Sequence, residues 1–153
     1  MTPNVGDEPV RLLIHAKDGS GEGVWAARTA APGIFELDNF PISPVDYTSG
    51  DLVMAADDGD GHLYITGLAE RRFRSTYLRC EAIDDKGPEA RARHRAIVEH
   101  LERPGLRLET LSLGWYGAAV PINMSEEAFA GLLASAPYPV REATDADAEP
   151  WTT

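Results

Sequence analysis

The sequence predicts an α+β protein in which an N-terminal, small antiparallel β-barrel-like unit of the SH3-like kind is packed with a C-terminal ferredoxin-like β-α-β-β-α-β unit. Two observations support this prediction. Short β-prone runs separated by Gly, Pro and Asp fill residues 9–70, whereas extended and helical patterns alternate over residues 71–143. Residues 144–153 are acidic and mostly small, and they predict a flexible tail.

The N-terminal unit contains short runs with the composition of β-strands, at residues 10–16, 24–29, 34–37, 52–55 and 62–67. Ala31-Pro32-Gly33 separates the second run from the third, and this composition favours a tight turn. Asp57-Asp58-Gly59-Asp60-Gly61 separates the fourth run from the fifth and predicts a hairpin turn. Because a small sheet hides its edges by closing, we expect a barrel, with a strongly bent open sheet as the alternative.

The C-terminal unit is expected to start with an extended run over residues 73–83, followed by a helix over residues 88–103. Pro88 suits the first helical position, and Pro104-Gly105 ends the helix. Helical spacing places one apolar face of this helix on Ala90, His94, Ile97, Val98 and Leu101.

Two further strands are expected after this helix. Residues 106–113 alternate as a strand does, but the alternation slips between Leu108 and Leu111, which predicts a bulge or an early end. Residues 116–122 form the next strand.

A second helix and a last strand complete the predicted order. The helix begins near Asn123 or Ser125, because Asn123 and Glu126 have the spacing of a capping box. Pro residues end it, and a short strand is expected around Val140.

Composition excludes several classes of protein. The 25 acidic and 14 basic side chains leave a net charge of −11, which repels nucleic acid and anionic lipid. No apolar run approaches the length of a membrane span, and the polar start lacks the pattern of a signal peptide. Cys80 is the only cysteine, which fits a reducing compartment. We therefore expect a cytoplasmic protein that binds neither nucleic acid nor membrane; the sequence does not indicate its oligomeric state.

The charge is unevenly distributed along the chain. Residues 29–70 contain eight acidic side chains and no Lys or Arg. Eight of the fourteen basic residues follow, within residues 71–95. This asymmetry predicts either an acidic surface that attracts a basic partner or pairing of the two charge groups within the molecule.

A series of short motifs carries a family resemblance: Glu22-Gly23-Val24-Trp25-Ala26, Gly33-Ile34-Phe35-Glu36-Leu37-Asp38-Asn39-Phe40-Pro41, Gly50-Asp51-Leu52-Val53 and Arg74-Ser75-Thr76-Tyr77-Leu78-Arg79. In this order they resemble a bacterial family, domain-of-unknown-function family 4265, over roughly residues 10–133. The sharpest element is the segment from Leu37 to Pro41, followed nine residues later by Gly50-Asp51. The resemblance implies no catalytic residue.

The central motif also has a structural interpretation. Asp38-Asn39 after a strand suits a turn capped by side chains, and Pro41 keeps the following loop extended. Gly50 suits the turn that leads into the next strand at Asp51. A loop that faces a ligand is the alternative, because loops on rigid scaffolds often carry function.

Known catalytic and metal-binding patterns are absent from the sequence. The acidic run at residues 57–61 does not fit a calcium loop, because Gly67 falls where the bidentate carboxylate is needed. The four histidines lack metal-ligand spacing, and Cys80 is expected to be a small buried side chain. Neither a nucleophile elbow nor a phosphate-binding loop is present. No metal, cofactor or catalytic residue is predicted, and an enzymatic activity stays open but is disfavoured.

Three functional hypotheses follow. The first is a non-enzymatic acidic module that binds a basic protein, as an immunity protein neutralises a toxin, through Asp38, Asp51, Asp57, Asp58, Asp60, Trp115 and Tyr116. The second is a protein, or an enzyme of an unrecognised kind, that binds a small anionic ligand between the two units through Arg72, Arg74 and Arg79. The third is a regulatory or structural interaction module. We favour the first.

Overall fold

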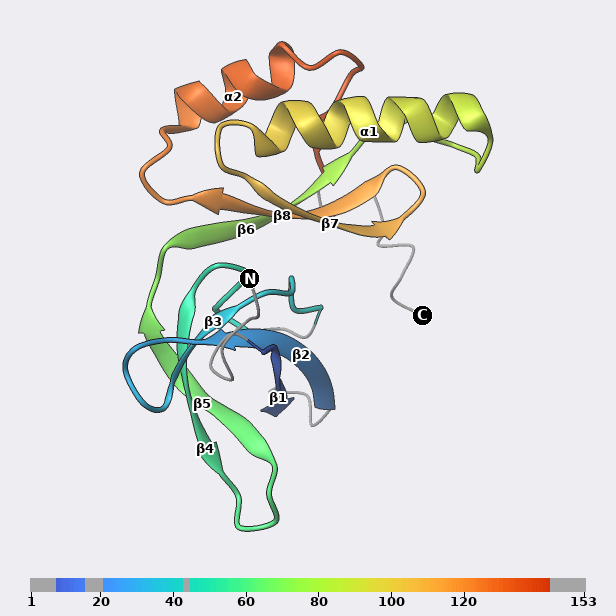
Figure 1. The fold of residues 1–153 in the computed structure, drawn as a ribbon. Coiled ribbons are helices and arrows are strands. Elements are labelled where there is room, and N and C mark those ends of the chain that lie inside the picture. Colours follow the sequence, from blue (N-terminus) through green and yellow to red (C-terminus); the bar gives the residue numbers. More distant parts are fainter. Residues whose placement is uncertain (1–7, 16–20, 43–44, 144–153) are drawn as a thin grey trace, which may run out of the picture. The chain divides into compact units, whose positions relative to one another are not determined.

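The structure is a computed structural model that describes residues 8–15, 21–42 and 45–143. The chain divides into two compact units, unit 1 (Met1–Arg74) and unit 2 (Ser75–Thr153). Among the described residues, unit 1 contains strands and no helix, whereas unit 2 contains two helices and strands, which confirms the predicted α+β class (Figure 1). The predicted acidic tail lies outside the described residues.

Unit 1 is a ring of five strands: β1 (Val10–His15), β2 (Gly21–Arg28), β3 (Ile34–Leu37), β4 (Leu52–Asp57) and β5 (Leu63–Glu70). Each strand is antiparallel to the next along the chain. The first and fifth strands therefore run in the same direction, and the parallel pair Leu13–Tyr64 closes the ring. The closed ring leaves no long free edge. The sheet is therefore closed, as expected, and not the bent open sheet that was the alternative.

The core of unit 1 lies inside the ring. Successive side chains of a strand point to opposite faces, and the buried residues follow that period of two, as Leu12 and Ile14 in β1 and Val24 and Ala26 in β2 show. Phe35, Leu37 and Val53 complete this cluster. The intervening residue of β2, Trp25, must therefore face outward.

Unit 2 has a four-stranded sheet in the order β7-β8-β6-β9. The elements are β6 (Phe73–Arg79), which begins in the last residues of unit 1, α1 (Pro88–Glu102), β7 (Arg107–Ser112), β8 (Trp115–Pro121), α2 (Glu126–Ala134) and β9 (Arg141–Glu142). Both helices cover the same face of the sheet (Figure 1). The core beneath them includes Leu78, Ile97, Leu101, Tyr116, Val120 and Phe129.

Local details in unit 2 both confirm and correct the sequence prediction. The register between β7 and β8 shifts between Thr110 and Ser112, which confirms the predicted bulge. The strand predicted to reach Ile83 ends instead at Arg79, because the chain turns there and Ile83 N donates to Cys80 O at 3.2 Å. The N-cap of α2 is Ser125 and not Asn123.

The Ser125 cap is made by its side chain. Ser125 Oγ accepts a hydrogen bond from Ala128 N at 3.0 Å, so it satisfies a helix N–H that otherwise lacks a partner in the first turn. Neither helix in the described part of the chain is long and apolar enough to cross a membrane.

Candidate functional site

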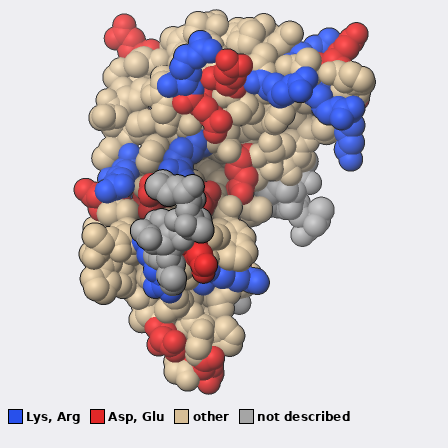
Figure 2. Space-filling model, viewed as in Figure 1, with Lys and Arg blue, Asp and Glu red and all other residues tan. Residues whose placement is uncertain are grey.

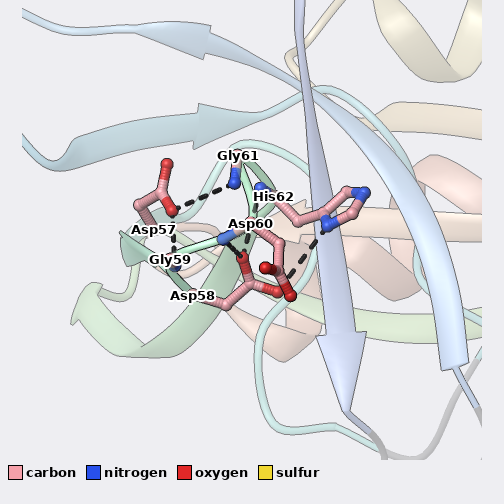
Figure 3. A network of polar contacts seen from close by, with 6 residues as sticks. All are labelled: Asp57, Asp58, Gly59, Asp60, Gly61 and His62. Atoms are coloured by element: carbon pink, nitrogen blue, oxygen red, sulfur yellow. Dashed lines mark hydrogen bonds and ion pairs between the residues drawn. The ribbon is translucent and has the colours of Figure 1, made fainter.

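The turn between β4 and β5 carries the most concentrated negative charge of unit 1. We call it the acidic tip and define it as Asp57, Asp58, Gly59, Asp60, Gly61 and His62 (Figure 3). In Figure 2, the end of this hairpin, at the bottom of the view, shows acidic atoms and no basic ones.

Two aspartates hold the backbone of the acidic tip. Asp57 Oδ1 accepts hydrogen bonds from Gly59 N at 2.7 Å and Gly61 N at 3.3 Å. Asp58 Oδ1 accepts from Asp60 N at 2.8 Å and from His62 N at 3.3 Å. Gly59 and Gly61 have φ angles of 95° and 86°, which glycine adopts without strain. Side chains of the loop thus hold its own backbone in this conformation (Figure 3).

In the part of the chain that the structure describes, the charges of the acidic tip have no Lys or Arg partner. The hydrogen bond from Asp60 N is the largest cause that lowers the pKa of Asp58, and the neighbouring His62 adds to it. Asp58 Oδ2 lies 3.6 Å from His62 Nδ1. Among the described residues, no Lys or Arg forms an ion pair with any of the three aspartates of the tip.

A surface pocket of about 470 Å³ adjoins the acidic tip. Its apolar wall comes from β1 and from the start of β5, and its lining residues are Val10, Arg11, Leu13, Gly61, His62 and Leu63. The Arg11 guanidinium lies against Gly23 of β2, because a Cβ added at Gly23 would be only 2.6 Å from Arg11 Nη2. Carboxylates beside an apolar wall suit a Lys or Arg side chain, whose stem is apolar and whose end is cationic.

The acidic tip presents carboxylates that can bind a positively charged group. Its carboxylates accept hydrogen bonds, and no Ser, Cys or Lys that could act as a nucleophile belongs to it. In the part of the chain that the structure describes, no three His, Cys, Asp or Glu side chains are grouped to hold a metal ion.

The predicted site residue Asp51 is not at the surface. Its side chain is fully buried, and Oδ1 accepts from Arg72 N at 2.7 Å and Phe73 N at 2.9 Å. Oδ2 accepts from Thr48 N at 2.9 Å. Asp51 therefore ties the start of β4 to the segment after β5, and its predicted role as a surface contact is corrected.

Asp38 and Asn39 lie at the end of β3, beside β2. Asn39 Oδ1 accepts from Trp25 N at 2.7 Å, and Asp38 N donates to Trp25 O at 2.9 Å. The side chains of Asn39 and Asp51 thus hold backbone groups of other segments, whereas the Asp38 side chain is exposed. The sequence predicted the turn, but not that its side chains would bond to other strands.

Trp115 and Tyr116, which were predicted to form one contact patch, face different surroundings in the structure. Tyr116 is fully buried, and its hydroxyl lies 2.7 Å from His94 Nδ1, so it is unavailable as a surface contact. Trp115 is half-buried, and the Arg79 guanidinium lies 5.0 Å from the centre of its ring. Neighbouring residues of a strand face opposite sides of the sheet, which is why this pair does not form one patch.

Burial has a measurable consequence for Tyr116, since desolvation, with a smaller effect of Cys80, raises its pKa from 10.0 to about 12. The unfolded phenol ionises first, so the contribution of Tyr116 to stability is complete below pH 10.0 and falls as the pH rises towards about 12. The absorbance of the Tyr116 phenolate is measured as the difference between the spectra of the wild type and of Tyr116→Phe. We expect this difference to develop near pH 12. A difference that develops near pH 10.0 would contradict the burial of this hydroxyl.

The three arginines that were predicted to bind a small anion, Arg72, Arg74 and Arg79, differ in their contacts. Arg72 Nε lies 3.0 Å from Glu70 Oε2, in an exposed ion pair. Arg79 Nη1 donates to Leu113 O at 2.8 Å, in addition to its contact with Trp115. Arg74 is half-buried at the start of β6. The contacts of Arg72 and Arg79 each stay within one unit.

Of the exposed apolar side chains of unit 1, the two that lie in strands were not among the predicted site residues. Trp25 in β2 is 50% exposed and Met54 in β4 is 41% exposed. Met54 faces Gly67 of β5 and belongs to the hairpin that carries the acidic tip. The alternation of buried and outward residues in each strand was the signal that could have identified both.

Comparison with known proteins gives little beyond the fold. No family model and no curated protein matches the chain. A crystal structure of a hypothetical protein from Neisseria gonorrhoeae is similar, with a TM-score of 0.51 and 16% sequence identity over 89% of this chain and 94% of that one. At this identity the similarity concerns the fold alone.

Proposed function

We propose that the protein is a non-enzymatic binding module whose unit 1 binds a basic protein through the acidic tip. The specific form that we favour is an immunity protein that neutralises a basic toxin. The observation that carries this proposal is a turn with three carboxylates and no Lys or Arg ion pair among the described residues, beside a pocket with an apolar wall.

The hydrogen bonds within the acidic tip support this function. Hydrogen bonds from four backbone N–H groups to Asp57 and Asp58 hold the loop in its conformation before any partner arrives. A preformed loop loses less conformational entropy on binding than a loop that must first become ordered. Its carboxylates attract a basic partner from a distance and increase the association rate.

Apolar contacts would then hold the partner. The pocket beside the tip presents Leu13 and Leu63, and Met54 lies exposed on the same hairpin. Methionine is flexible and adapts to the surface of a partner. The proposed interface therefore has charged residues for encounter and apolar residues for retention.

The test compares full-length protein with a variant in which Asp57, Asp58 and Asp60 are all replaced by Asn. Asn keeps the side-chain oxygen that accepts the backbone hydrogen bonds, so the turn is preserved while three charges are removed. The immobilised proteins are used to capture partners from a lysate of the source cells. We expect the wild type to retain a basic protein that the variant retains at least about tenfold less.

A second variant controls for net charge. Glu99→Gln, Glu126→Gln and Glu127→Gln together remove three exposed carboxylates from the helices of unit 2. This variant should capture the basic protein as the wild type does. Equal losses in both variants, or the capture of no basic protein by the wild type, would contradict the proposal.

Finer features of the fold and family are also proposals. We infer that unit 1 is of the SH3-like kind and unit 2 of the ferredoxin-like kind. The ring of five strands supports the first, and the β-α-β-β-α-β order with β6 beside β8 supports the second. Membership of the bacterial family 4265 stays a prediction, as does the cytoplasmic location, which the single cysteine supports.

A further inference from the structure

Independently of the acidic tip, we propose that a pocket in unit 2 binds a small organic anion with an apolar body. This pocket, which we call the α1 pocket, has a volume of about 460 Å³, within the range of small-molecule sites. The lining residues that carry the argument are Ile83, Lys86, Ala90, Arg91, His94 and Leu113.

The walls of the α1 pocket are mainly apolar. Ile83, Ala90 and Leu113 supply these walls from the turn after β6, from α1 and from the turn before β8. Gly114 completes the lining and is required there, because a Cβ would overlap Cys80 O and lie 2.6 Å from Ile83 O. An apolar ligand body would lose its contact with water against these walls.

The charged groups of the α1 pocket favour an anion. Within the described residues, Lys86 and Arg91 form no hydrogen bond or ion pair through their side chains, and both are exposed. The carboxylate of the lining, Asp85, already accepts from Gly87 N at 2.7 Å. The two cations therefore outnumber the single carboxylate, which is itself partly neutralised by an N–H donor.

The start of α1 adds to this positive potential. The N-cap is Gly87, which makes no side-chain cap, and the first helical residue is Pro88. The N–H groups of Glu89 and Ala90, in the first turn, consequently lack a capping side chain. Because the N-terminus of a helix carries partial positive charge, an anion near Ala90 and Arg91 is stabilised.

His94 supplies a directional contact. Its Nδ1 is held by the buried Tyr116 hydroxyl at 2.7 Å, and the two rings are stacked with 5.6 Å between their centres. In the tautomer in which the hydroxyl donates to Nδ1, the proton of the ring lies on Nε2. Nε2 has no partner within the described residues and is available to donate to the ligand.

The site is tested by titrating the isotope-labelled full chain with phenylacetate, octanoate and phenyl phosphate, and with neutral phenylacetamide as the reference. We expect at least one anion to cause saturable shifts centred on the amides of Ala90, Arg91, His94 and Gly114. Phenylacetamide should bind at least about tenfold more weakly than phenylacetate or cause no saturable shift, since it lacks the charge that Lys86 and Arg91 attract.

Variants locate the charge that matters. Lys86→Gln with Arg91→Gln should weaken anion binding about tenfold, the loss expected when a charge-assisted contact is removed. Arg95→Gln with Arg103→Gln changes the net charge equally outside the pocket and should leave binding unchanged. Circular dichroism verifies that both variants fold. Saturable binding by none of the anions, equal binding of the amide, or equal losses in both variants would overturn the proposal.

Discussion

Replacement of Gly50 by Ala is expected to lower the free energy of unfolding of unit 1 by about 3 kcal/mol or more. Gly50 has a φ of 89°, in the region that costs a residue with a Cβ about 1–2 kcal/mol. The new Cβ would also lie 3.0 Å from Phe73 Cζ and overlap the nearer atoms of that ring. Such overpacking typically costs a further 1–3 kcal/mol or so.

Urea unfolding, followed by hydrogen exchange of the β1–β5 amides, measures this loss. Gly59→Ala is the matched control, because Gly59 has a similar φ of 95° and no atom within 4 Å of an added Cβ. It should cost only the conformational part, about 1–2 kcal/mol. If both variants lost the same stability, the close approach of Phe73 to Gly50 would be refuted.

Asp51→Ala is the second substitution with a large expected effect. It removes an acceptor of three backbone hydrogen bonds, from Thr48, Arg72 and Phe73, at a buried position. A buried donor left without a partner costs about 1–3 kcal/mol; the Thr48 N–H is buried and those of Arg72 and Phe73 are partly buried, so the total loss should be about 4 kcal/mol. Unit 1 would then be only marginally stable or unfolded.

Asp46→Ala provides the comparison for Asp51→Ala. Asp46 is an exposed aspartate a few residues earlier in the chain, and its loss should change stability by less than about 0.5 kcal/mol. The same unfolding measurement serves for both. Similar values for the two variants would mean that Asp51 does not hold β4 to the segment after β5.

Local turn chemistry explains which parts of the fold the sequence predicted well. The strand over residues 34–37 has the bounds that were expected, because Ala31-Pro32-Gly33 and Asp38-Asn39 define its ends. The run predicted over residues 73–83 was too long, since Cys80 and Ile83 are apolar yet lie in a turn. Both are buried in the core of unit 2. Their apolar character therefore indicated burial and not strand structure.

The candidate sites show a similar division. The aspartates of residues 57–60 were identified because Asp and Gly together indicate an exposed turn. Asp51 and Tyr116 were misplaced because residue type alone does not distinguish a buried hydrogen-bonding group from an exposed one. The α1 pocket combines residues 83–94 with residues 110–114, and only the folded chain brings these segments together.

The central claim is that the carboxylates of the acidic tip attract a basic partner. Its most direct test is the association rate constant of the captured partner, measured at low and at high salt for the wild type and for the Asn variant at positions 57, 58 and 60. At low salt, the wild type should associate at least about tenfold faster, and this advantage should shrink as salt screens the charges. Equal rate constants with the same dependence on salt would contradict the claim.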